Sequence, residues 1–362
     1  MSEAQALRLT YCAIVTIAFI LAGIGRNFRE QQKHYLVYVV ILILAILIGF
    51  RPIDAFTDLP MYENWFNQIC RKGWLVVNNK FNEFGQDPVF SILFFITSPL
   101  KSFNFTLTLI SFLTLYLTYK VSQLYTSREN NGSPLLLFFC LIINFTYLNQ
   151  QDNVMRIGLA FPLLLFYLYY FYSREYKKAI IFGVLATGIH FSMAVAICIS
   201  VMAKYINCSL KWYYVLFFLI LLASAAGASI QQFVGNFGFS KAEIYSQLKS
   251  SGNYKVGFRP DFALFNTLFL LFFIWTNKKK PSEFLTYYIR LYVLFSCWFF
   301  LWFKVPYNDR VGAFSWNLIP IISYFECIGK FHRKKVVWGS YLFGALLMMN
   351  LIIFIHITRL LT

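Results

Sequence analysis

The sequence predicts an all-α polytopic integral membrane protein with about 10–12 membrane helices. Of its 362 residues, 59% are hydrophobic and only 13% are charged, whereas a soluble domain has about 25% charged residues. Apolar runs such as 35–50 and 341–357 have nearly the length that crosses a bilayer. The first run, 11–24, lacks a small-x-small cleavage site, so we expect it to be retained as a span.

The chain has a net charge of +17 and seven cysteines. Cytoplasmic loops of membrane proteins collect Lys and Arg, and an anionic lipid surface or substrate accounts for the rest. No motif of a nucleic-acid-binding fold occurs, so we expect no nucleic-acid partner. The cysteines form no CxxC pair, so we expect no structural disulfide, no metal site and no cofactor.

Hydrophobic segments follow one another along the whole chain, with no linker rich in Ser or Gly between them. We therefore expect a single transmembrane domain over residues 1–362. The segments are 7–24, 35–50, 88–100, 104–121, 135–149, 156–173, 179–203, 212–230, 261–277, 284–303, 311–328 and 336–357.

The charges of the loops predict the orientation of these segments. The basic loops 277–283 and 329–335 are typical of the cytoplasmic side, as is 173–178. Loop 51–87 holds four Lys or Arg against five Asp or Glu, so we place it outside, together with loop 231–260.

This orientation requires an odd number of spans between 51–87 and 173–178, where four apolar segments occur. It also requires an even number between 173–178 and 277–283, where three occur. We therefore predict re-entrant segments near 88–100, which is short for a span, and near 179–203, which His190 interrupts. The alternative is that 88–100 is a tilted span and that one loop charge count misleads.

Loop 51–87 contains the stretch FTDLPMYENWF, in which Pro60 suits a helix start and Asp58 a helix cap. Tyr62, Trp65, Phe66 and Ile69 share one helical face, which predicts an amphipathic helix at the membrane interface with its aromatic face toward lipid. The functional alternative is that this helix covers a polar cavity, with an acidic side chain turned into it. Two more carboxylates, Glu83 and Asp87, precede the next apolar segment.

Two polar residues interrupt later apolar segments. Arg156 begins a span and follows the polar run that contains Gln150 and Asp152; it either snorkels to the surface or binds an anion at the outer face. His190 lies in mid-segment with Ser192 close by. It either bonds a neighbouring helix or transfers protons.

Arginines recur at the outer ends of apolar segments. Arg guanidinium groups bind phosphate in bidentate fashion and remain charged, so several of them suit a lipid-linked diphosphate at headgroup depth. For Arg310, a surface pair with Asp309 is the alternative. The four are Arg51, Arg156, Arg259 and Arg310.

Four short motifs, in order along most of the chain, resemble the EpsG family, which is related to Wzy-type O-antigen polymerases. They are Asp58…Tyr62, Asp87-Pro88, Arg156…Ala160 and His190…Ser192. The family often has Glu-Pro in place of Asp87-Pro88, which leaves the roles of Asp87 and Glu83 open.

The resemblance implies a multi-pass protein of the bacterial cytoplasmic membrane with a GT-C-like architecture. It implies glycosyl transfer that polymerises undecaprenyl-diphosphate-linked oligosaccharide repeat units on the outer face, for O-antigen, capsule or exopolysaccharide. Expected partners are these lipid-linked oligosaccharides, membrane lipids and a chain-length regulator protein. The alternatives are a flippase of such lipids, or an O-acyltransferase acting on polysaccharide.

Such a transfer needs cations at the leaving diphosphate and a base at the acceptor hydroxyl. Expected catalytic residues are Arg156 and Arg310 as cations, with His190 and Asp58 as the alternative bases. Expected substrate-binding residues are Arg51, Tyr62, Trp65, Glu83, Asp87, Gln150, Asp152, Ser192, Arg259 and Tyr307.

Overall fold

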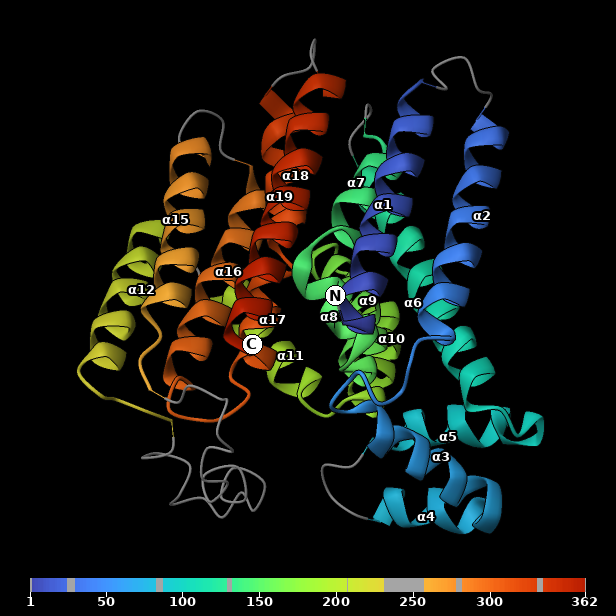
Figure 1. Ribbon diagram of the computed structural model, residues 1–362. Helices are drawn as coiled ribbons and strands as arrows, with labels where there is room; N and C mark the ends of the chain where they lie inside the picture. The colour runs from blue at the N-terminus through green and yellow to red at the C-terminus, as the bar shows by residue number, and fades with distance from the viewer. Residues whose placement is uncertain are drawn as a thin grey trace. The chain divides into compact units, whose positions relative to one another are not determined.

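The structure, a computed structural model, describes residues 2–24, 30–82, 87–128, 132–206, 208–230, 257–277, 282–330 and 335–361. Every regular element in these ranges is a helix (Figure 1). Helices Glu3–Gly23, Phe103–Thr126, Met155–Tyr172 and Glu283–Leu301 are long and apolar enough to cross a membrane, and further shorter apolar helices accompany them. The predicted all-α polytopic membrane fold is therefore confirmed.

The contacts within the described chain group it into two compact units, and the single transmembrane domain expected over residues 1–362 stays a prediction. The first unit comprises Met1–Ile197 and Val336–Ile353, and the second comprises Cys198–Lys335 and Phe354–Thr362. No linker in the sequence marks this division, because its boundaries lie within α11 (Met193–Tyr205), at the start of α19 (Lys335–Leu361) and within α19 after Ile353.

The first unit contains long helices and a layer of short helices that lies across them (Figure 1). The long helices are α1 (Glu3–Ile24), α2 (Glu30–Gly49), α6 (Phe103–Thr126) and α9 (Met155–Tyr172), and the shorter α10 (Tyr176–Ile189) packs against α9. The crosswise layer comprises α3 (Leu59–Lys72), α4 (Trp74–Asn82) and α5 (Pro88–Thr97), followed by the 3₁₀ helix η1 (Ser98–Leu100).

Several predicted spans are broken in the structure. Segment 179–203 breaks at His190, as its sequence suggested, into α10 and α11. Segment 135–149, predicted as one span, consists of α7 (Pro134–Ile142) and α8 (Phe145–Asp152). Segment 311–328 likewise divides into α17 (Asp309–Trp316) and α18 (Ile319–Lys330). The re-entrant paths of 88–100 and 179–203 stay a prediction.

Polar side chains explain the break between α7 and α8. Asn144 precedes α8 with an extended backbone and donates a 2.8 Å hydrogen bond to the Thr146 hydroxyl, which competes with continuation of α7. Gln150, Gln151 and Asp152 on α8 are all buried, so this helix brings polar groups into the interior of the unit.

The second unit contains α12 (Leu210–Ala225), α15 (Pro260–Asn277), α16 (Glu283–Leu301), α17 and α18. Its core has a buried amide, Asn266, whose side-chain oxygen accepts hydrogen bonds from Tyr292, Ser296 and Ser315 at 3.0–3.3 Å. These bonds connect α15 to α16 and α17. Loop 231–260, predicted to lie outside, falls mostly outside the described residues.

Gly158 sets how closely α8 approaches α9. A Cβ at this position would lie 2.8 Å from the Gln150 carbonyl oxygen, which is backbone and unable to turn aside.

We expect Gly158→Ala to destabilise the protein by about 1–3 kcal/mol through overpacking, seen as a lower thermal midpoint of the detergent-purified protein. The control is Gly344→Ala in α19, where the added methyl meets open space and the midpoint should hold or rise. Equal midpoints for the two variants would contradict the close approach.

Candidate functional site

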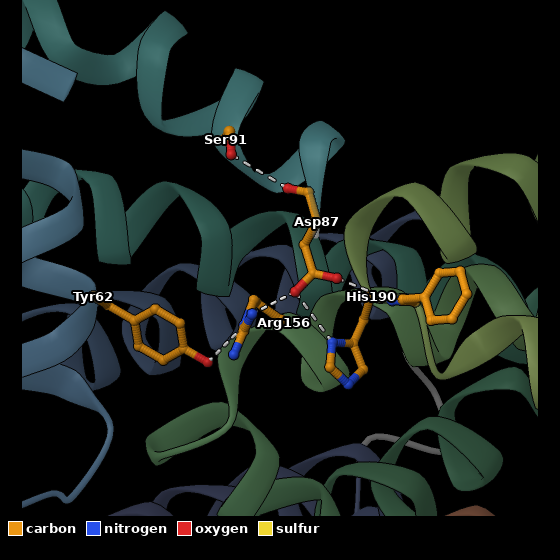
Figure 2. Close-up of polar contacts among 6 residues, drawn as sticks. Tyr62, Asp87, Ser91, Arg156 and His190 are labelled. Carbon is orange, nitrogen blue, oxygen red and sulfur yellow. Dashed lines mark hydrogen bonds and ion pairs between the residues drawn. The ribbon is translucent and has the colours of Figure 1, made fainter. Parts of the chain in front are cut away.

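The site centres on Asp87, a buried carboxylate that binds groups from two other segments (Figure 2). Its Oδ2 atom forms an ion pair with Arg156 Nη1 and lies 3.4 Å from His190 Nδ1. Its Oδ1 atom accepts a 3.0 Å hydrogen bond from the backbone N–H of Phe191. One carboxylate therefore connects the start of α5, the start of α9 and the end of α10.

The local backbone explains why these three groups meet. Asp87 precedes Pro88, which disfavours a helical conformation for the residue before it, and α5 begins at the proline. Arg156 lies in the first turn of α9. His190 ends α10 with an extended backbone (φ −150°, ψ 115°), so the following N–H points away from the helix and reaches Asp87.

Arg156 is held by aromatic residues of α3 as well as by Asp87. Its Nε donates a 3.1 Å hydrogen bond to the Tyr62 hydroxyl. Its guanidinium carbon lies 5.4 Å from the Tyr62 ring centroid and 5.9 Å from that of Trp65, within the range of cation–π attraction. A guanidinium has five N–H donors, so these contacts fix its orientation and leave donors for a ligand.

The carboxylate of the site is more deeply buried than the two basic side chains that contact it. The Asp87 side chain is 3% exposed, whereas those of Arg156 and His190 are each 20% exposed. Burial by itself opposes ionisation of Asp87, but the His190 ring, the Arg156 charge and the Phe191 N–H together hold its pKa below the ordinary value. Asp87 is therefore an anion at neutral pH, and the accessible edges are a guanidinium and an imidazole.

A second buried ionic cluster interacts with Tyr62 through the charge of Arg51. Arg8 Nε is 3.4 Å from Asp152 Oδ2, and Asp152 is fully buried. Burial raises the pKa of Asp152, although the charges of Arg8 and Arg51 oppose this rise. Burial lowers the pKa of Arg51 to about 10, against the attraction of Asp152 and Tyr62. Arg51 therefore stays protonated at neutral pH, so Arg51 and Arg156 both act on Tyr62.

Two expectations for the start of α3 were wrong. Asp58 occupies the cap position, but its side chain makes no capping hydrogen bond; instead, its backbone N–H donates to Asn153 Oδ1 at 2.9 Å. The aromatic face of α3 was expected to face lipid. Tyr62 and Phe66 are buried because they pack against Phe90, Phe94 and Phe103, so protein covers this face.

The structure brings together only some of the predicted site residues. Tyr62, Trp65, Asp87, Arg156 and His190 share one cluster. Arg51 and Asp152 lie in the adjacent cluster, Gln150 is buried on α8, and Ser192 follows His190 with a buried hydroxyl. Glu83 falls outside the described residues.

Arg259, Tyr307 and Arg310 belong to the second unit, where they make local contacts. Arg259 forms a two-bond ion pair with Asp261, at 3.0 and 2.6 Å. The Arg310 guanidinium stacks on the Tyr307 ring at 4.8 Å. Tyr307 has a positive φ of 60°, a conformation that is rare for residues other than Gly, Asn and Asp.

Sequence reasoning missed three contributors. Arg8, Asn153 and the Phe191 N–H were not among the expected site residues. Of these, Asn153 had a signal, because it closes the polar run that precedes Arg156. No pattern in the sequence could indicate that the Phe191 backbone faces Asp87.

The lowered pKa of Asp87 gives a pH-dependent prediction. Because its folded-state pKa lies below the ordinary 3.8, its contribution to stability is present above about pH 4 and is lost as pH falls through the folded-state pKa. We expect Asp87→Asn to destabilise the protein at pH 7, by less than the about 3–5 kcal/mol of a fully buried pair. The difference from wild type should shrink below about pH 4 in thermal unfolding.

The matched control for this prediction is Asp261→Asn. It breaks another Arg–Asp pair, but one whose carboxylate side chain is 51% exposed, so its effect should stay below about 1 kcal/mol. Equal losses for the two variants, or a loss at Asp87 that does not depend on pH, would contradict the role of Asp87 as a buried anion.

Comparison with known proteins identifies the family. The model of the EpsG family matches residues 34–361, a range that includes Asp87, Arg156 and His190. No curated protein and no solved structure matches the chain, so the GT-C-like architecture stays a prediction. Because the family match covers far more than half of the sequence, the chain belongs to the EpsG family.

Proposed function

We propose that this protein polymerises undecaprenyl-diphosphate-linked oligosaccharide repeat units by glycosyl transfer on the outer face of the bacterial cytoplasmic membrane. Membership of the EpsG family supports a role of the polysaccharide-polymerase type. The observation that carries the proposal is the bridge from Asp87 to both Arg156 and His190. Through this bridge a guanidinium and an imidazole contact the same carboxylate, which supports the roles of cation and base that the reaction needs.

The bridge suits the two requirements of the reaction. The acceptor hydroxyl oxygen attacks the anomeric carbon of the donor sugar, and the bond from that carbon to the diphosphate oxygen breaks. The electron pair leaves with the diphosphate, whose growing charge the Arg156 guanidinium stabilises. The acceptor proton passes to His190, which is the better-supported base of the two that the sequence suggested.

Asp87 serves both partners without contacting substrate. Because the carboxylate faces Nδ1 of His190, it favours the tautomer with the proton on Nδ1, in which Nε2 carries the basic lone pair. The negative charge then stabilises the imidazolium that forms. The same carboxylate and the Tyr62 hydroxyl hold Arg156 from two sides, which reduces the reorganisation needed when the leaving group becomes charged.

Asp58 is a weaker candidate for the base. Its backbone is fixed to Asn153, and its carboxylate accepts a long 3.4 Å hydrogen bond from the Thr57 hydroxyl. Its backbone carbonyl accepts a 3.2 Å hydrogen bond from the Tyr62 N–H in the first turn of α3. We therefore assign it to fixing the start of α3, which carries Tyr62 and Trp65.

The hairpin of α9 and α10 supports the outer location. The two helices pack against each other and are joined by the short turn at 173–175. One end of the hairpin carries Arg156 and His190, and the other carries Arg174, Lys177 and Lys178. Because basic loops favour the cytoplasmic side, the Asp87 bridge belongs to the opposite side, where lipid-linked repeat units would be joined.

Single substitutions of Arg156 and His190 test the proposal. In a deletion strain, Arg156→Ala should remove the long-chain polysaccharide ladder while single repeat units remain on the surface, because a lost transition-state cation costs about 10²–10³ in rate. His190→Gln should have a similar effect, since a positioned base contributes about 10²–10⁴. Arg156→Lys keeps the charge but lacks the planar fork, so it should give a short ladder. The measurement is gel analysis of surface polysaccharide at matched protein levels.

The control is Lys178→Gln, at the basic end of the same hairpin. Lys178 forms an exposed pair with Glu175, so its loss should leave the ladder unchanged. Normal ladders for Arg156→Ala and His190→Gln would overturn the proposal. Repeat units stranded on the inner face would instead indicate a flippase.

A further inference from the structure

The crosswise layer meets the long helices at a corner between α5 and α6 (Figure 1). η1 and Lys101 form this corner, and the end of α3 and the start of α4 are close to it. Cys70 Sγ donates to the Ser98 carbonyl at 3.7 Å, and the Trp74 and Phe95 rings are 5.4 Å apart. We name the exposed residues here the corner patch: Arg71, Lys72, Trp74, Ile96, Leu100 and Lys101.

The corner patch combines three cations with large apolar side chains. Arg71, Lys72 and Lys101 are exposed, and Trp74, Ile96 and Leu100 are between 51% and 65% exposed. Water around a soluble domain disfavours such an apolar surface. The same combination is typical of the membrane interface, where Trp lies at headgroup depth and basic side chains reach toward phosphates.

The chain segments that form the patch also carry no acidic residue. The sequence has no Asp or Glu in residues 64–82 or in residues 88–128. The patch cations therefore have no neighbouring carboxylate in the chain segments that form the corner. Their charge is complementary to an anionic partner.

The backbone at Lys101 strengthens this interpretation. Lys101 adopts a left-handed conformation with φ 49°, which favours Gly or Asn over lysine. Its N–H donates to Ser98, and Ser102 then caps α6 by accepting from the Phe105 N–H at 3.3 Å. A turn that glycine would form more easily carries a cation instead.

The apolar side of the patch continues onto the span. Phe105 and Leu109 on α6 are exposed, and α6 is one of the helices able to cross a membrane. The exposed apolar surface of α6 thus begins where the patch ends. This continuity indicates a bilayer, rather than a soluble protein, as the partner.

We propose that the corner patch binds anionic phospholipid headgroups of the leaflet on which the site opens. The three cations contact lipid phosphates, and the apolar side chains insert below them. α5 then connects this anchor to Asp87 at its other end, about 15 Å away for ten residues. This inference does not depend on the glycosyl transfer reaction.

A nitroxide at position 96 tests the proposal in the full chain reconstituted in nanodiscs. The variant is Ile96→Cys, with the exposed native cysteines Cys70 and Cys198 replaced by Ser. The same background without Ile96→Cys gives the signal of the remaining thiols. The collision rate of the nitroxide with oxygen, which concentrates in lipid, is compared with its collision rate with a water-soluble nickel chelate. Both rates are measured in nanodiscs with increasing fractions of phosphatidylglycerol. We expect the label to move into lipid as that fraction rises.

Charge variants identify the cause of any insertion. Arg71→Gln, Lys72→Gln and Lys101→Gln combined should abolish the response, since each cation near an anionic surface contributes about fivefold and three about a hundredfold. The swap Arg71→Lys, Lys72→Arg and Lys101→Arg should leave it intact. Lys101→Gly suits the positive φ, so the turn keeps its fold, yet the response should weaken by about fivefold.

Three outcomes would overturn the proposal. One is a label that remains accessible to the nickel chelate at every lipid composition. Another is an unchanged response in the neutral triple variant. The third is a response to added undecaprenyl diphosphate but not to phosphatidylglycerol, which would assign the corner patch to the substrate.

Discussion

The fold of the first unit depends on one buried carboxylate. Asp87 accepts contacts from Arg156, His190 and the Phe191 backbone, and these groups come from segments about 70 and 100 residues further along the chain. A buried anion is tolerated only when cations and N–H donors compensate for its lost hydration. The crosswise layer and the α9–α10 hairpin must therefore meet at this point.

α8 supports this arrangement through contacts with α1 and with the start of α3, the helix that carries Tyr62. Asn153, just after α8, binds the backbone of Asp58 at the start of α3, and Asp152 pairs with Arg8 of α1. Gly158 allows α8 to approach α9 closely. The short polar helix thus fixes the position of the start of α3. From α3, the Tyr62 hydroxyl reaches Arg156. A break in a predicted span gives the interior the polar groups that an unbroken apolar helix could not supply.

The sequence predicts the membrane class and most apolar segments, because hydrophobic runs of spanning length are typical of membrane helices and rare in soluble domains. It also identifies Arg156 and His190, since isolated ionisable residues at apolar segments are costly and need a partner. It does not predict that Asp87 is that partner for both, because the contact joins residues far apart in the chain. The break in 135–149 was missed for a related reason: the run is apolar enough for a helix, and Asn144 acts only through its local backbone.

The sequence predicted that four arginines converge on one diphosphate, but composition does not determine which of them are neighbours. Each of them lies near an apolar segment end, as expected, but Arg259 and Arg310 contact residues of their own unit. A position near the end of an apolar segment indicates the depth of a residue in the membrane. It does not predict which segments are neighbours in the membrane plane. Arg51 and Arg156 are related through Tyr62, with which both charges interact, and the sequence does not predict this relation.

The α9–α10 hairpin constrains how relatives of this chain can change. The spacing of Arg156 and His190 depends on the register of two packed helices joined by a turn of three residues, 173–175. One inserted residue within either helix would rotate all positions beyond it by about 100°, turning Arg156 or His190 away from Asp87. Lineages of this protein should therefore lengthen or shorten their loops freely, while insertions and deletions inside these two helices are eliminated by selection.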